Sequence, residues 1–338
     1  MSLLGNLFKP KIDKLKERAD IEGLKAILVS DAKSEDKVGA IDALVELEGG
    51  GTAEALAGAL GDADPVVDQA AEKALRGLGA ESAEALAVAL AAPIGDRALG
   101  LLLDLGDASA EPLGNAAQNE EETCRHRAIS GLLDLANTTG DETAREFCFR
   151  AILAALGDRA PACRAEAASG LAAFGDPRAA RALAAQLKDG DESVRTACRN
   201  TLRGMGSPAA PFLIDALADR NPNSRLLAVG LLAEIDTAPV EVQDRQAVLI
   251  TLVDLLDSKD EVFAKAANTA IERIPAADVV DGQLERLEDP NSDEREETED
   301  LVRRLLEHGS MSPTERKAAD QRLTRILAEE IDASADTY

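Results

Sequence analysis

A repeat of about 30 residues runs through this chain and is clearest between Pro177 and Asp236. Six positions of one copy, Leu183, Leu187, Asp189, Arg195, Leu202 and Met205, correspond to Leu213, Leu217, Asp219, Arg225, Leu232 and Ile235 in the next. A period of this length indicates stacked supersecondary units rather than a single globular core. A chain of 338 residues built in this way grows by adding units, so its length does not imply two globular domains.

Each copy is predicted to form two short helices. Apolar residues in the first half recur at helical spacing, and the polar turn Asp189 to Ser193 separates them from a second apolar stripe that begins at Val194. Asp191 is suited to cap the second helix, and Gly206-Ser207-Pro208 is a stop signal after it. Two helices of this length cannot bury both stripes alone. The sequence therefore predicts an all-α, right-handed α-solenoid of about nine stacked hairpins.

The two ends of the chain are predicted to close the stack. Residues 1–20 hold Leu3, Leu4, Leu7 and Phe8 followed by several basic residues, and we interpret them as a cap over the first repeat. The alternative is a docking peptide for a partner or an anionic membrane surface. The solenoid is expected over residues 21–309, and a closing helix over 310–331 starts at a capping box formed by Ser312 and Glu315. Residues 332–338 are expected to be a disordered tail.

The pattern of Leu, then Asp, then Val or Cys with Arg, then Ala, then Leu and a terminal Gly recurs along most of the chain. One further copy includes Leu156, Asp158, Cys163, Arg164 and Gly175. This pattern resembles HEAT-like repeats, specifically the short kind named after the phycobilisome lyases, over roughly residues 20–308. The resemblance implies a helical solenoid and is weak for function, because the repeat serves many unrelated roles.

The charge of the chain is strongly negative and dispersed. It carries 63 acidic and 37 basic residues, a net charge of −26, while aromatic residues make up 2% and Trp is absent. Self-repulsion of this size is tolerable where salt shortens the Debye length to about 3 Å. The composition therefore favours a protein adapted to molar salt, as in haloarchaea; the alternative is an ordinary acidic cytosolic protein.

The same charge disfavours nucleic acid as a partner, because binding to the phosphate backbone requires a basic face. No apolar run approaches the length of a membrane span, and no signal peptide is visible. Cys124, Cys163 and Cys198 fall on the apolar stripes of second helices, where we expect buried, reduced thiols. These features predict a cytoplasmic protein, which we expect to be monomeric.

One arginine recurs at the start of the second helices, and an aspartate recurs in the turn before it. In the structural interpretation, each arginine holds turn acids or carbonyls of its own or the next repeat; in the functional one, some arginines bind an anionic partner. Arg199 and Arg203 lie outside the recurrence and, with Arg195, form a local basic strip on one predicted helix. We predict that this strip contacts a protein partner, with Arg164 and Arg225 on either side. The recurring arginines are Arg125, Arg164, Arg195, Arg225 and Arg295.

No motif for chemistry is found. His126 and His308 are the only histidines, which leaves no histidine set for a metal or for the iron of a hydroxylase built from HEAT repeats. Gly49-Gly50-Gly51 lacks the Lys-Ser/Thr of a phosphate-binding loop. We therefore predict no catalytic residue, no metal and no cofactor.

The predicted function is a non-enzymatic scaffold or adaptor for protein–protein interaction. The family that the chain resembles includes adaptors, some of them linked to archaeal taxis signalling. Two alternatives stay open: an activity like that of the bilin lyases that give the repeat its name, and a purely structural spacer.

Overall fold

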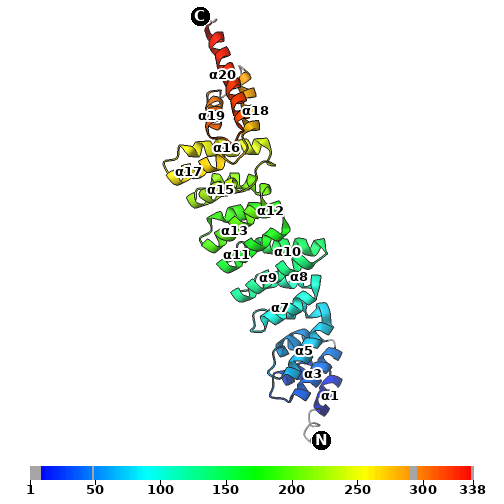
Figure 1. The fold of residues 1–338 in the computed structure, drawn as a ribbon. Helices are drawn as coiled ribbons and strands as arrows, with labels where there is room; N and C mark the ends of the chain where they lie inside the picture. Colours follow the sequence, from blue (N-terminus) through cyan, green and yellow to red (C-terminus); the bar gives the residue numbers. More distant parts are fainter. Residues whose placement is uncertain (1–8, 48, 290–294, 336–338) are drawn as a thin grey trace. The chain divides into compact units, whose positions relative to one another are not determined.

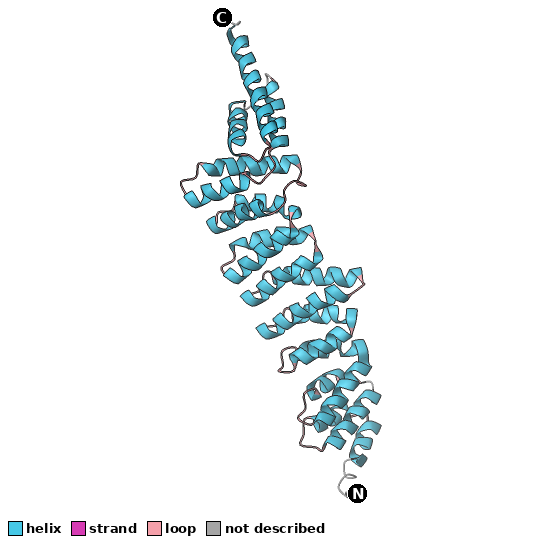
Figure 2. Cartoon of the chain, in the orientation of Figure 1, coloured by secondary structure: helices cyan, strands magenta, loops and turns pink. Residues whose placement is uncertain are grey.

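The computed structural model describes residues 9–47, 49–289 and 295–335, and these residues form helices joined by short loops (Figure 2). They contain no β-strand, and one isolated bridge joins Pro275 and Ser310. The chain divides into two compact units, Met1–Gly170 and Leu171–Tyr338. The all-α solenoid predicted from the repeat is confirmed.

The first unit is a stack of hairpins in which helices alternate between two layers (Figure 1). Within a hairpin the two helices pack together, and most helices also pack on their counterpart in the next hairpin, as α7 and α9 do. The helices of this unit are α1 (Lys9–Glu17), α2 (Ile21–Leu28), α3 (Ser34–Leu47), α4 (Thr52–Ala59), α5 (Pro65–Leu78), α6 (Ala83–Ala89), α7 (Gly95–Asp104), α8 (Ala110–Ala116), α9 (Glu122–Thr138), α10 (Glu142–Ala155) and α11 (Pro161–Gly170).

The second unit continues the same pattern along the chain. Its second helices, α13, α15 and α17, pack on one another in order, and so do its first helices, α12, α14, α16 and α18. Its helices are α12 (Pro177–Ala185), α13 (Glu192–Met205), α14 (Ala210–Leu217), α15 (Pro222–Glu234), α16 (Val242–Leu256), α17 (Glu261–Ile271), α18 (Ala277–Glu288), α19 (Arg295–His308) and α20 (Pro313–Ala335). The pairs from α2–α3 to α18–α19 reproduce the predicted hairpins.

Local sequence signals set the hairpin boundaries. The Asp191 carboxylate accepts a hydrogen bond from the Ser193 amide at the start of α13, and Asp64 and Asp176 cap α5 and α12 in the same way, each ahead of a proline. At the other end, a glycine in the left-handed region ends several second helices, at a backbone angle that a side chain would strain. These glycines are Gly79 (φ 57°), Gly106 (φ 60°), Gly175 (φ 61°) and Gly206 (φ 68°).

The core lies between the two layers of each unit. One leucine position recurs in the second helices from α5 to α15, or directly after the helix in the case of Leu171, which follows α11. It is buried at each occurrence, which is the burial that the apolar stripes predict. These leucines are Leu75, Leu102, Leu132, Leu171, Leu202 and Leu232.

The terminal helices pack as caps. α1 contacts α2 and α3, and α20 contacts α18 and α19. The Ser312 and Glu315 capping box is confirmed, because the Ser312 amide donates to the Glu315 carboxylate at 2.8 Å and the Glu315 amide donates to the Ser312 hydroxyl at 3.3 Å. Helix α20 runs to Ala335 rather than to the expected Ile331, so the first residues of the predicted tail are helical. Residues 1–8, with the four apolar residues of the predicted cap, and residues 336–338 lie outside the described part of the chain.

All four cysteines are buried and free, as predicted for three of them. Burial raises the pKa of the Cys148 thiol to about 11 and that of Cys198 to about 12. Both thiols therefore remain protonated at neutral pH and are packing groups rather than nucleophiles.

Replacing Cys198 with alanine is expected to cost about 1 kcal/mol of unfolding free energy or less, because only one buried atom is lost. The equivalent positions in other second helices are Ala71 and Ala167, and both are fully buried. Urea unfolding measures this loss, and Leu202→Ala in the same helix serves as the reference, with an expected cost of about 2–5 kcal/mol. Equal losses in the two variants would contradict this account of the position.

Candidate interaction surface

The recurring arginines fold back on the turns that precede their own helices. The guanidinium of Arg195 donates to the Asp189 carbonyl at 2.6 Å, and that of Arg225 donates to the Asp219 carbonyl at 2.9 Å. Arg164 does the same to the Asp158 carbonyl at 2.8 Å, and Arg295 to the Asp289 carbonyl at 2.7 Å. These contacts agree with the structural interpretation, because each arginine donates to a carbonyl of its own repeat.

The turn aspartates stabilise the same turns, because their carboxylates accept hydrogen bonds from backbone amides. Asp158 accepts from the Ala160 amide at 2.7 Å, and Asp189 and Asp219 accept from amides two residues later at 2.8 Å each. A local bond of this kind stabilises a turn between two helices. The paired recurrence of Asp and Arg in the sequence is thus explained by the hairpin turn.

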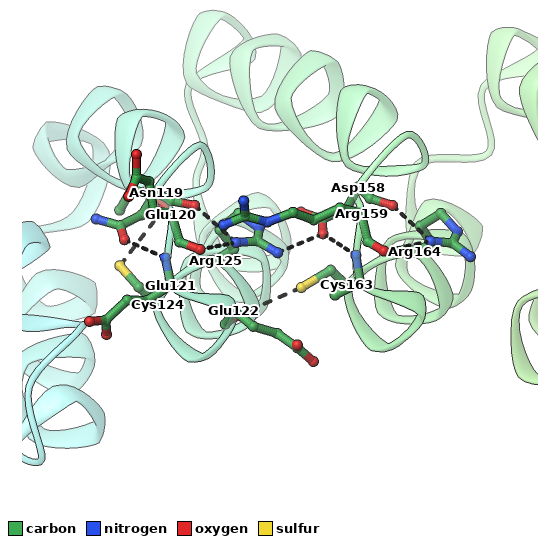
Figure 3. A network of polar contacts seen from close by, with 12 residues as sticks. Asn119, Glu120, Glu121, Glu122, Cys124, Arg125, Asp158, Arg159, Cys163 and Arg164 are labelled. Atoms are coloured by element: carbon green, nitrogen blue, oxygen red, sulfur yellow. Dashed lines mark hydrogen bonds and ion pairs between the residues drawn. The ribbon is translucent and has the colours of Figure 1, made fainter.

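Arg125 has a further role in the first unit. It donates to the Asn119 and Glu120 carbonyls of its own turn and also makes a two-pronged pair with Asp158 of the next repeat (Figure 3). The pair joins Nε to Oδ2 at 2.7 Å and Nη2 to Oδ1 at 2.9 Å, and the two side chains are 5% and 6% exposed. Burial alone would raise the pKa of Asp158, but the Arg125 guanidinium and the Ala160 amide outweigh it and hold this pKa below its usual value.

Arg199 and Arg203 face a single acid of the neighbouring second helix. Both belong to α13, and both reach Glu234 on α15, with Arg199 Nη2 at 3.1 Å from Glu234 Oε1 and Arg203 Nε against Oε2. The Arg199, Arg203 and Glu234 side chains are 42%, 39% and 33% exposed. Burial would raise the pKa of Glu234, but the two arginines lower it below its usual value. Two cations share one carboxylate, so this cluster keeps a net positive charge at the surface.

The structure brings together Arg199 and Arg203, whereas Arg195 and Arg225 of the same unit make contacts of their own. Arg195 pairs with Glu192 of its own helix in addition to its turn. The Arg225 guanidinium lies 5.2 Å from the centre of the Phe263 ring on α17, a cation–π contact with the following hairpin. Arg164 belongs to the first unit and holds its own turn.

A groove lies between α15 and α17 on the side where Glu234 sits. Its volume is about 620 Å³, within the range of ~300–1,000 Å³ of small-ligand and side-chain sites. Small and aliphatic residues form much of its lining, and Val262 at its edge is 60% exposed. The lining residues are Gly230, Ala233, Glu234, Glu261, Val262, Lys265, Ala266, Thr269 and Arg273.

Sequence reasoning missed Glu234, Lys265 and Arg273. None of the three belongs to the recurring pattern, and Glu234 takes the position that Gly204 holds in the preceding repeat. The signal that would have found them is a departure from the repeat consensus at these positions, rather than a recurrence.

Within the described ranges, no group of three or more His, Cys, Asp and Glu side chains is arranged to hold a metal ion. Nor does any helix in those ranges have the length and apolarity to cross a membrane.

Residues 109–203 and 149–233 match the family model described as HEAT repeats. This central segment is similar to HEAT repeats. The match runs from α8 to the last turn of α15. It includes the Arg125–Asp158 pair, Arg199 and Arg203, and it ends one residue before Glu234.

Two solved structures are similar to the chain at low identity. One is an engineered protein with 18% identity, 94% coverage of this chain, 90% coverage of that chain and a TM-score of 0.35. The other is YibA of Escherichia coli, with 17% identity, 81% coverage of this chain, 99% of that chain and a TM-score of 0.36. No curated protein matches the sequence.

Proposed function

We propose that the chain is a non-enzymatic scaffold for protein–protein interaction and that Arg199 and Arg203 lie at its partner contact. HEAT repeats offer extended surfaces for protein ligands. The observation that carries the proposal is the pairing of two surface arginines with one glutamate on a chain whose net charge is −26. A local positive site on such a chain attracts an acidic group of a partner, and it repels few groups of the surrounding surface, which is mostly acidic.

The two other predicted residues of the second unit support this contact rather than form it. Arg195 and Arg225 hold the turns that orient α13 and α15, and Arg225 also packs on Phe263. Arg164 has the same role for its own turn in the first unit.

The test reverses the charge of the pair. Arg199→Glu with Arg203→Glu is expected to lose partners that the wild-type chain recovers from native lysate in molar KCl, because an acidic ligand then meets three carboxylates. The control reverses Arg150 and Arg303, which are more exposed and each pair with a glutamate of their own helix. Quantitative mass spectrometry of the captured proteins measures the loss.

A second variant separates binding from stability. Arg199→Gln with Arg203→Gln removes the positive charge without adding repulsion against Glu234, and exposed ion pairs contribute only about 0.2–1 kcal/mol each. If both double variants fold and keep every partner at wild-type yield, the arginine pair is a solvated face, and the chain acts through another surface or as a spacer.

The finer setting is also part of the proposal: a monomeric adaptor in the cytoplasm of a cell with high internal salt, such as a haloarchaeon, with a role in taxis-type signalling. The dispersed acidic charge and the buried free thiols support this setting. A bilin-lyase-like activity would instead appear as a covalent adduct when the chain is mixed with a bilin and a phycobiliprotein subunit.

A further inference from the structure

The groove between α15 and α17 has an apolar floor that this chain leaves uncovered in its described part. Ala233 and Ala266 contribute methyl groups, and Gly230 contributes none. A Cβ atom placed on Gly230 would meet no heavy atom within 4 Å, so space is open above this residue. Val262 adds an exposed isopropyl group at the rim. A mid-helix glycine that is not required by packing costs helix stability, by up to about 1 kcal/mol relative to alanine.

The rim of the groove carries basic groups from both sides. Lys265 has no ion-pair or hydrogen-bond partner for its ammonium group among the described residues. Arg273 donates to the Ala233 carbonyl at 3.1 Å, which fixes it as one wall. On the α13 side, Arg199 and Arg203 outnumber the Glu234 that they share. Glu261, in the first turn of α17, is the one remaining acid of the lining. The four bases Lys265, Arg273, Arg199 and Arg203 therefore outnumber the two acids Glu234 and Glu261 at and beside the groove.

We propose that the α15–α17 groove binds an acidic amphipathic helix of a protein partner. The apolar side chains of the partner helix enter the groove above Gly230 and Ala266. The carboxylates of the partner helix contact Lys265, Arg273 and the pair of Arg199 and Arg203. Helix-in-groove recognition places apolar anchors at i, i+3 or i+4 and i+7, a spacing that suits a groove between two helices. Charge complementarity selects the acidic partner, because a basic segment would be repelled at this rim while it is attracted to most of the remaining surface. This inference rests on the proposed scaffold function and names the chemistry of its partner.

The probe is a synthetic helical peptide of ~15 residues, long enough to form a helix, with leucines at i, i+4 and i+7 and glutamates at the other exposed positions. A second peptide keeps the leucines and replaces every glutamate with lysine. Fluorescence anisotropy with the full-length chain in ~0.15 M KCl, where the Debye length is about 8 Å, measures both affinities. The acidic peptide is expected to bind at least about tenfold more tightly to this site than the basic one.

Gly230→Leu fills the groove and is expected to weaken binding of the acidic peptide by about tenfold or more. Gly100→Leu on α7 is the control, because Gly100 is an exposed helical glycine that, like Gly230, has open space around its Cβ position. This control should bind as the wild type does. Lys265→Glu should weaken binding severalfold and should leave folding unchanged, because its ammonium supports no contact.

Three results would overturn the proposal. In the first, the wild-type and Gly230→Leu chains bind the acidic peptide equally. In the second, the basic peptide binds the wild type as tightly as the acidic one, and Gly230→Leu abolishes that binding. In the third, the wild-type chain dimerises while Gly230→Leu is monomeric, which would assign the groove to a second copy. If Gly230→Leu keeps every native partner that the double arginine variants lose, the scaffold function stands and the groove proposal fails.

Discussion

Replacing Arg125 with alanine is expected to lower the free energy of unfolding of the first unit by about 3–5 kcal/mol. The substitution leaves Asp158 buried without its partner, and it also removes two hydrogen bonds to the turn before α9. An unpaired buried charge is costly because the carboxylate has lost its water and gains no counter-charge. Hydrogen exchange measures the effect locally, as a loss of amide protection in α9 and α11.

The control for Arg125 is Arg195→Ala in the second unit. Arg195 makes the same bond to its own turn, but its ion-pair partner is the exposed Glu192 of the same helix. Its loss should cost only about 1 kcal/mol, the net value of an ordinary hydrogen bond. The double variant Arg125→Met with Asp158→Leu should recover much of the stability, since a buried ion pair is often replaceable by apolar side chains. Equal, small losses in Arg125→Ala and Arg195→Ala would contradict a buried pair between the two repeats.

The thermal midpoint of the chain is expected to rise from dilute buffer to molar KCl, by an amount on the order of 10 °C. Two opposite effects are screened by salt: attraction within the exposed ion pairs, and repulsion among dispersed carboxylates. Each exposed pair contributes about 0.2–1 kcal/mol, while the net charge of −26 makes repulsion the larger sum. Chloride salts are required for the comparison, because sulfate and phosphate stabilise most folded proteins by exclusion.

A local control for this salt effect lies in the first unit. A hollow there is ringed by Glu84, Asp107, Glu111 and Asp141. Glu84→Gln with Glu111→Gln removes two of these charges, and neither glutamate has a salt-bridge partner among the described residues. This variant should be more stable than the wild type in dilute buffer and nearly equal to it in molar KCl. A thermal midpoint that stays constant or falls as KCl is added would contradict the adaptation to high salt.

The hairpins could be predicted from the sequence because their boundaries are local. A capping aspartate, a proline at the first helical position and a terminal glycine such as Gly206 act within a few residues, and the buried leucines repeat with them. The turn contacts of Arg195 and Arg225 followed from the same recurrence. These features depend on the conformation of one repeat and not on its neighbours.

Contacts between repeats were not predictable in the same way, because they depend on the rotation of one hairpin against the next. The pair of Arg125 with Asp158 of the next repeat is such a contact, and a pattern defined within one repeat does not specify it. Glu234 became a partner of two arginines because α15 places a single departure from the consensus opposite α13. A repeat pattern contains no information on such pairs, so the candidate surface is defined only by the packing of neighbouring second helices.

The central claim, that the arginine pair of the second unit lies at a protein contact, is tested most directly by photo-crosslinking. A benzophenone amino acid is placed at Gly204, next to Arg203, or at Gly58 on α4; both are exposed helical glycines with no heavy atom within 4 Å of a Cβ position. Irradiation of native lysate in molar KCl should give a discrete adduct from position 204 that is absent from position 58 and is lost in the Arg199→Glu, Arg203→Glu background. No adduct at 204, or equal adducts at both positions, would contradict the claim.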